Sequence, residues 1–331
     1  MSKLASFEKI NYLLRPSKQI ERKIIIDLLA RLNLTIPISK YQYIGMGSIY
    51  YFDFILMHKY FNINKMVSID NKSCKKRFLF NKPYDFVDFE NCNTSDYLYR
   101  HNYSKNSMFW LDYDGHIIAN DFLKEDVSIL GKNCSKGDIF FITINCETPK
   151  EKDRLSFLNE FSAYIPPEDN TIKKVTPSFF PQLVQQILLN MIADSCEHNP
   201  NKFLKIASFT YKDGTLMYTL GGIFTDSEDE LRDSFAANEL FQFGREKIYN
   251  IRVPNLTYSE KYYLDSNING IEELIRYAKE YWDNKININE TVEEKVNDYL
   301  AQELAFELSH ADLENYIKYY RYVPQYFETL I

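Results

Sequence analysis

The sequence predicts an α/β fold in which a mostly parallel sheet is covered by helices. Three observations predict it. Short apolar runs typical of buried strands alternate with apolar patterns of helical period between residues 41 and 196. A glycine turn, with Gly45 and Gly47, joins the first of these runs to a helix. Two further runs, residues 203–211 and 215–224, flank a Lys-Asp-Gly turn and predict a closing β-hairpin.

The first strand, turn and helix belong to one strand–helix–strand unit. The run from Tyr41 to Ile44 meets the glycine turn, and an apolar helical pattern follows from Ile49 to Phe61. A second short run, from Met66 to Ile69, ends on Asp70. This order over about 30 residues is typical of a βαβ unit, so both strands are predicted to run in parallel.

The residues of this unit indicate a ligand that contains adenosine. Gly45 and Gly47 let the backbone approach a ligand and take a positive φ, and from Ser48 the helix start offers unpaired N–H groups. Asp70, 23 residues after Gly47, lies where a carboxylate binds ribose hydroxyls. The third glycine of a dinucleotide-binding turn is replaced by Tyr50, which favours S-adenosylmethionine over a dinucleotide. The alternative is an ordinary turn with Asp70 as a strand-end cap.

A second candidate site follows the predicted fourth strand, the run from Met108 to Leu111. Asp112 and Asp114 come directly after it, and ligands bind outside the carboxyl ends of such strands. We expect the side chains of these two residues to point to opposite sides of the chain, and so not to act as a pair. Asp112 is predicted to face the ligand and act in catalysis. Asp114 is predicted to support it or to cap a helix that starts at Ile117.

Two other residues are predicted to contact the cofactor. The third strand ends near Asp88, which could accept a hydrogen bond from an adenine amino group; a plain turn residue is the alternative. Arg15 precedes Pro16, a suitable first-turn residue for a helix. With Lys18 and Arg22 it forms a cationic stripe that could face a carboxylate or phosphate. For Lys18 and Arg22 a solvated helix face is the preferred interpretation.

Composition and charge divide the 331 residues into three predicted parts: an N-terminal helical segment (1–39), an α/β core that binds the cofactor (40–225) and a mainly helical extension (226–331). Residues 1–31 carry a net charge of +4, and the extension carries 11 basic and 22 acidic side chains. This distribution does not favour binding of nucleic acid over the whole surface, although it leaves a local basic patch possible. The acidic extension could bind a partner protein.

Cysteine content and hydropathy predict a cytoplasmic protein without a bound metal. The five cysteines form no Cys-x-x-Cys pair and no metal-binding spacing with histidine. Their odd number and scattered positions fit a reducing compartment. No apolar run reaches the 18 residues expected of a membrane-spanning helix.

The order of elements and motifs resembles the class I, Rossmann-like S-adenosylmethionine-dependent methyltransferases. The matching motifs are YIGMGS (43–48), Asp70 and LDYDG (111–115). More narrowly, NYLLRPSKQIERK, YIGMGSIYYFDF and VSID resemble uncharacterised bacterial O-methyltransferases, some of them beside phage-defence genes. The resemblance implies a seven-stranded sheet, S-adenosylmethionine as cofactor and methyl transfer to an unidentified acceptor, on oxygen. It also implies a link to antiviral defence.

The sequence departs from the family pattern in two places. Tyr43 stands where many members have an acidic residue before the glycines. The fourth-strand motif is not the Asn-Pro-Pro-Tyr type of the amino-group methyltransferases, so methylation of a nucleobase nitrogen is disfavoured. The alternative function is a catalytically weak or inactive module that binds an adenosine ligand and scaffolds a partner. A nicotinamide-dependent enzyme is disfavoured by the missing third glycine.

Overall fold

The computed structural model describes residues 15–71, 74–119, 122–227, 231, 240, 247–284 and 291–324. Within them the chain forms two compact units. The first holds Arg15 and residues 24–250, and the second holds Pro16–Lys23 and the residues from Ile251 onwards. Residues 1–14 of the predicted N-terminal helical segment lie outside the described residues.

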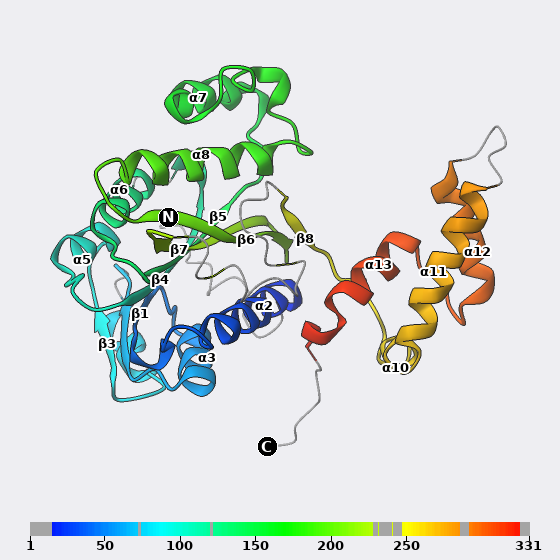
Figure 1. Ribbon diagram of the computed structural model, residues 1–331, viewed down its shortest axis with the longest axis horizontal. Helices are drawn as coiled ribbons and strands as arrows, with labels where there is room; N and C mark the ends of the chain where they lie inside the picture. Colours follow the sequence, from blue (N-terminus) through cyan, green and yellow to red (C-terminus); the bar gives the residue numbers. More distant parts are fainter. Residues whose placement is uncertain are drawn as a thin grey trace. The chain divides into compact units, whose positions relative to one another are not determined.

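The first unit is built on one sheet of eight strands, in the order β3-β2-β1-β4-β5-β7-β6-β8 (Figure 1). Strands β1 to β5 pair in parallel, and β7 is antiparallel to both β5 and β6. This confirms the predicted Rossmann-like α/β fold, with β8 as an eighth strand beyond the predicted seven. The strands are β1 (Gln42–Gly45), β2 (Lys65–Ile69), β3 (Val87–Glu90), β4 (Ser107–His116), β5 (Ile139–Asn145), β6 (Lys202–Lys212), β7 (Leu216–Thr225) and β8 (Tyr249–Ile251).

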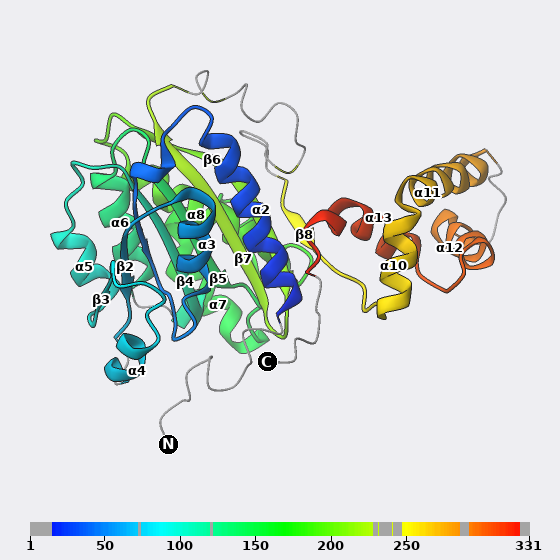
Figure 2. The same ribbon diagram turned by 90° about the horizontal axis from the view of Figure 1, so that it is seen from below.

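Helices cover both faces of this sheet, which is why its central strands are apolar along nearly their whole length. Figures 1 and 2 show α5, α6 and α8 on one face, and α3 with the second half of α2 on the other. The helices of this unit are α2 (Pro16–Leu32, shared with the second unit), α3 (Phe52–Phe61), α4 (Lys75–Phe80), α5 (Thr94–Arg100), α6 (Leu123–Asn133), α7 (Glu151–Phe161) and α8 (Phe180–Ser195), with short 3-10 turns at Ile38–Lys40, Ile117–Ala119, Ser162–Tyr164 and Ile172–Lys174.

Some predicted boundaries are confirmed and others are wrong. Pro16 stands in the first turn of α2, as predicted. The helix after the glycine turn starts at Phe52 rather than Ile49, because residues 48–50 form a separate turn. The helix predicted from Ile117 starts at Leu123, after a single 3-10 turn.

The second unit is a small bundle of amphipathic helices: α10 (Tyr258–Ser266), α11 (Ile268–Asp283), α12 (Val292–Glu303) and α13 (His310–Tyr319), followed by a 3-10 turn at Tyr320–Tyr322. Apolar side chains such as Ile271, Leu300 and Leu313 form its core. Thr257 forms a capping box with Glu260 at the start of α10.

Candidate functional site

The carboxyl ends of the parallel strands meet at one edge of the sheet, and three predicted site residues lie there. Gly45 ends β1, Asp70 directly follows β2, and Asp112 lies towards the end of β4. Because β1 lies between β2 and β4, the order of strands reverses at β1. Open α/β sheets bind their ligands in the crevice outside such a reversal.

The turn between β1 and α3 holds two residues other than glycine in the left-handed region. Ser48 has a φ of 48° and Tyr51 a φ of 50°. Such conformations cost roughly 1–3 kcal/mol each and are concentrated at ligand sites. The N–H of Tyr50 donates to Ser48 Oγ at 3.3 Å, which stabilises the turn. The backbone segment that is predicted to contact the cofactor is therefore strained.

The two glycines of this turn do not have the predicted conformation. Neither Gly45 nor Gly47 has a positive φ, so that part of the prediction is wrong. A Cβ on Gly45 would lie 2.8 Å from the Tyr43 hydroxyl, and one on Gly47 would lie 2.8 Å from the ring of Phe54. Close packing against aromatic side chains therefore explains why both residues are glycine.

Tyr51 connects the strained turn to Asp70. Its ring is fully buried, and its hydroxyl donates to the backbone oxygen of Phe78 in α4 at 3.2 Å. Burial raises the pKa of Tyr51 to about 12, and the negative charge of Asp70 also acts to raise it. Asp70 is half-buried and lies close enough to this hydroxyl for its charge to act on it.

Hydrogen bonds hold the loops after β2 and β3 together. The N–H of Asp70 donates to the backbone oxygen of Glu90 at 3.1 Å, and Asn71 Nδ2 donates to Asn93 Oδ1 at 2.8 Å. Glu90, at the end of β3, pairs with Arg100 at 2.8 Å. Asp88 is exposed and lies two residues earlier in the strand, level with Val67 of β2. Glu90, rather than Asp88, is thus the carboxylate at the end of this strand.

The end of β4 is irregular where the two candidate catalytic carboxylates lie. Asp112 is level with Thr143 of β5, but the next pair is His116 with Asn145. Three residues of β4 thus stand opposite one of β5, as in a special bulge. Asp112 is half-buried, and Asp114 is exposed. The strand was predicted to end at Leu111, so the prediction missed that Asp112 pairs with β5 and that Asp114 lies in the bulge. In a regular strand residues two apart share a face, so the expected opposite directions do not follow from their spacing.

His116 joins this bulge to the segment after β5. The N–H of Ile118 donates to His116 Nδ1 at 3.3 Å, which leaves Nε2 to carry the proton and donate to the backbone oxygen of Glu147 at 2.5 Å. Glu147 Oε1 accepts the N–H of Leu216 at 2.9 Å and pairs with Lys212 at 3.2 Å. These contacts lower the pKa of Glu147, the bond from Leu216 most of all. The role of Glu147 was not predicted, because its partners are distant in sequence.

The preferred interpretation of the cationic stripe on α2, a solvated helix face, is wrong for Lys18 and Arg22. Lys18 and Arg22 are not on a solvated face: the Lys18–Glu21 ion pair, 2.7 Å long, is fully buried, and Arg22 is 3% exposed. Arg15 is half-buried and directly precedes the helix. Its contact with a cofactor stays a prediction.

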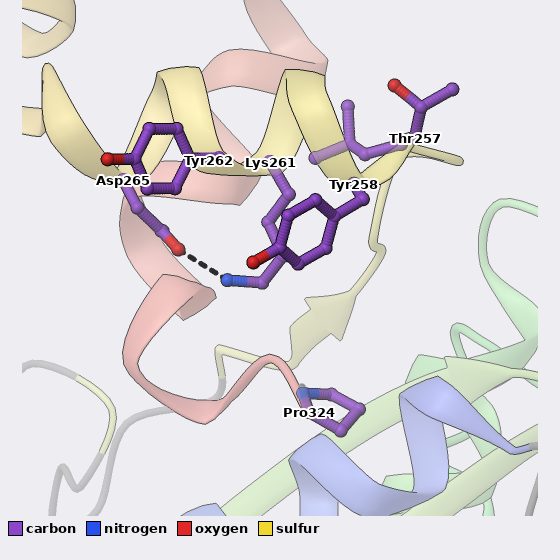
Figure 3. Close-up of a pocket in the computed structure, with 7 residues that line it drawn as sticks. Thr257, Tyr258, Lys261, Tyr262, Asp265 and Pro324 are labelled. Carbon is purple, nitrogen blue, oxygen red and sulfur yellow. Dashed lines mark hydrogen bonds and ion pairs between the residues drawn. The ribbon is translucent and has the colours of Figure 1, made fainter. Parts of the chain in front are cut away.

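Two hollows lie away from the strand ends. One, of about 410 Å³, is lined by side chains of α6, by Tyr164 and by the end of α8. The other, of about 250 Å³, lies in the helical unit, where Tyr258 and Tyr262 flank the ion pair between Lys261 and Asp265 (Figure 3). Neither is lined by the residues at the strand ends.

Two other kinds of site are absent from the described residues. No group of three or more His, Cys, Asp or Glu side chains in these ranges could hold a metal ion. None of the helices in the described ranges combines the length and apolar character needed to cross a membrane.

Several solved structures align with this chain at low sequence identity. Trm1 from Pyrococcus horikoshii, solved with S-adenosyl-L-methionine, aligns with a TM-score of 0.44 and 12% identity over 66% of this chain and 58% of that one. A "putative S-adenosylmethionine dependent methyltransferase" from Listeria monocytogenes aligns at 0.37 and 8%, over 61% of this chain and 99% of that one. An O-methyltransferase family protein from Burkholderia thailandensis aligns at 0.32 and 12%, over 62% and 60%.

The chain thus matches little more than half the length of the Trm1 chain. No curated protein is similar enough in sequence to match. Residues 10–331, however, match the model of a family described as "Putative O-methyltransferase". Because this match spans nearly the whole sequence, the chain belongs to that O-methyltransferase family.

Proposed function

We propose that this protein transfers a methyl group from S-adenosylmethionine to an oxygen atom of an acceptor. The observation that carries the proposal is the meeting of three features at one sheet edge. These are the strained turn after β1, Asp70 after β2 and Asp112 in the bulge of β4. Membership of the O-methyltransferase family supports the same reaction.

The residues near β1 and β2 would hold the cofactor. The backbone of Gly47 and Ser48 would contact its amino-acid end, with Gly45 behind them, and Asp70 would accept hydrogen bonds from the ribose hydroxyls. Asp70 is suited to this because it is half-buried and its own N–H is already bonded to Glu90. Arg15 would pair with the cofactor carboxylate. On the adenine side, Asp88 is retained as a candidate beside Glu90.

Asp112 would act on the acceptor. A bound S-adenosylmethionine would supply a methyl group on a sulfonium centre, and S-adenosylhomocysteine would leave as the acceptor oxygen takes the methyl group in line. The acceptor hydroxyl must lose its proton as its oxygen bonds to the methyl carbon. Asp112 would orient that hydroxyl and take the proton. Asp114 is exposed, and we assign it a supporting role.

Calorimetric titration with S-adenosylmethionine, S-adenosylhomocysteine and NAD tests the proposal. We expect the first two ligands to bind and NAD not to bind, because the turn lacks the third glycine that accommodates a pyrophosphate. Preferential binding of NAD would overturn the proposal.

A cytoplasmic location is part of the proposal and is supported by the five free cysteines.

A further inference from the structure

A buried carboxylate on α6 receives hydroxyl groups from two other elements. Asp126 is fully buried. Ser95 in the first turn of α5 donates to its Oδ1 at 2.5 Å, and Tyr113 in β4 donates to its Oδ2. Both carboxylate oxygens therefore have a short hydrogen bond from a neutral hydroxyl.

Burying a carboxylate in this way costs stability, so the arrangement calls for a reason. Burial raises the pKa of Asp126 to about 6, although the two hydroxyl groups act to lower it. The neighbouring charges of Glu125 and Asp96 act to raise it further. An apolar side chain would fill this site without the cost of burying a charge. What the carboxylate provides instead is a fixed position for Ser95 and Tyr113.

Tyr113 stands in the part of β4 that the ladder does not hold. Pairing of β4 with β1 ends at Trp110, and pairing with β5 passes from Asp112 directly to His116. Residues 113–115 of β4 thus lie outside its pairing register with β1 and with β5. The hydroxyl of Tyr113 anchors this bulge at one end, and the bond from His116 to Glu147 anchors it at the other.

The anchor of Tyr113 also fixes the direction of Asp112. Tyr113 packs in the core between the sheet and the α5, α6 and α8 layer. Successive strand residues point to opposite faces, so Asp112 is turned to the other face. Ser95 extends the same anchor to α5, whose preceding residue Asn93 is bonded to Asn71 beside Asp70.

We propose that Ser95, Tyr113 and Asp126 are positioning residues that hold Asp112 at the transferable methyl group. The inference rests on the proposed function. Without the Tyr113–Asp126 bond, the bulge would relax and the Asp112 carboxylate would move away from the sulfonium. The three residues would thereby link the ribose side of the site to the side where transfer occurs.

The ratio of affinities for S-adenosylmethionine and S-adenosylhomocysteine tests this without a known acceptor. The two ligands differ in the methyl group and the positive charge on sulfur, so a nearby carboxylate favours the first. Asp112→Asn should lower the ratio roughly fourfold, as expected for unit charges about 5 Å apart in a water-like medium. Tyr113→Phe, which removes one hydroxyl, should lower it at least twofold. Ser95→Ala should act in the same direction.

Two comparisons separate positioning from general damage. Tyr103→Phe removes another tyrosine hydroxyl next to the same core, one that donates to the backbone oxygen of Leu98 at 3.0 Å. It should leave the ratio unchanged, whatever its effect on the melting temperature. In an Asp112→Asn background, Tyr113→Phe should cause no further change, because the charge that it positions is already absent.

The outcomes that overturn the inference differ from those that overturn the proposed function. If Asp112→Asn lowers the ratio but Tyr113→Phe and Ser95→Ala do not, the inference is wrong and the proposed function stands. An equal effect of Tyr113→Phe with and without Asp112 also overturns it. If neither ligand binds, or Asp112→Asn leaves the ratio unchanged, the proposed role of Asp112 fails and takes the inference with it.

Discussion

The hydroxyl of Tyr43 fills the space beside Gly45, two residues further along β1. The two residues point to the same face of the strand, and a Cβ on Gly45 would lie 2.8 Å from the Tyr43 oxygen. Tyr43 is 1% exposed, and its ring packs edge-to-face on Phe54 of α3 at 4.9 Å. The tyrosine therefore cannot move aside without disturbing the packing of α3 on the sheet.

Gly45→Ala should destabilise the fold by about 1–3 kcal/mol, the range for an extra methyl group forced into a packed core. Urea unfolding measures the loss. Tyr43→Phe removes the atom closest to the added methyl group, so the double variant should be more stable than the sum of the two single effects predicts. A Gly45→Ala protein as stable as the wild type would contradict this account of the turn.

Asp70→Ala should weaken binding of S-adenosylmethionine by roughly 1.5–3 kcal/mol, as expected when a carboxylate that accepts hydrogen bonds from a ligand is removed. Calorimetry measures the effect. Asp85→Ala provides a control, because Asp85 is an exposed carboxylate in the loop before β3. Equal affinities of the Asp70 and Asp85 variants would place Asp70 outside the cofactor site.

The sequence predicts the elements better than the geometry of the site. Apolar runs and a glycine turn are local signals, so β1, β2 and the carboxylate that follows β2 are predicted from them. The irregular end of β4 is not, because a bulge depends on which residues of β5 stand opposite Asp112 and His116. The predicted conformation of the turn was also wrong in detail. Glycine permits a positive φ, but Ser48 and Tyr51 adopt it, while Gly45 makes room for Tyr43.

Buried polar groups were also missed, since burial depends on the tertiary fold. Asp126 lies in an ordinary amphipathic helix, and its partners Ser95 and Tyr113 are 31 and 13 residues away in sequence. Lys18 and Arg22 have the spacing of a solvated helix face, yet both are buried. Spacing identifies residues that share a face, but it does not show whether that face is covered.

Asp126→Asn should change how stability depends on pH. The pKa of Asp126 in the fold, about 6, exceeds its unfolded value, so protonation favours the folded state. Its charged form therefore costs stability as the pH rises from 4 to 6, by about 3 kcal/mol in total. Burial lowers the pKa of His101 to about 4, below its unfolded value. Stability from His101 is thus lost as the pH falls from 6.5 to 4, which opposes the effect of Asp126.

Burial also raises the pKa of Asp138 to about 6, so Asp138 titrates in the same range in both proteins. The Asn variant lacks only the contribution of Asp126, so its stability relative to that of the wild type should fall as the pH drops from 6.5 to 4.5. Urea unfolding at several pH values gives both curves. Parallel curves would mean that Asp126 does not carry a raised pKa in the folded protein.

Asp112→Asn distinguishes an enzyme from a binding module. The change keeps the size of the side chain and most of its hydrogen bonding but removes its charge. If Asp112 takes the acceptor proton, turnover should fall by roughly 10²–10⁴, the usual contribution of a general base. The affinity for S-adenosylmethionine should fall only severalfold, since Asp70 and the turn after β1 hold the rest of the cofactor.

Release of S-adenosylhomocysteine with a panel of hydroxyl-bearing acceptors measures turnover, and the melting temperature shows whether the variant is folded. Asp114→Asn is the matched control, because Asp114 lies in the same bulge but is exposed. We expect it to reduce turnover no more than a few-fold. If the protein is a binding module, neither the wild type nor the variants should show turnover. A folded Asp112→Asn protein with full activity would remove Asp112 from the reaction and leave the carboxylates at the ends of β2 and β3 as the remaining candidates.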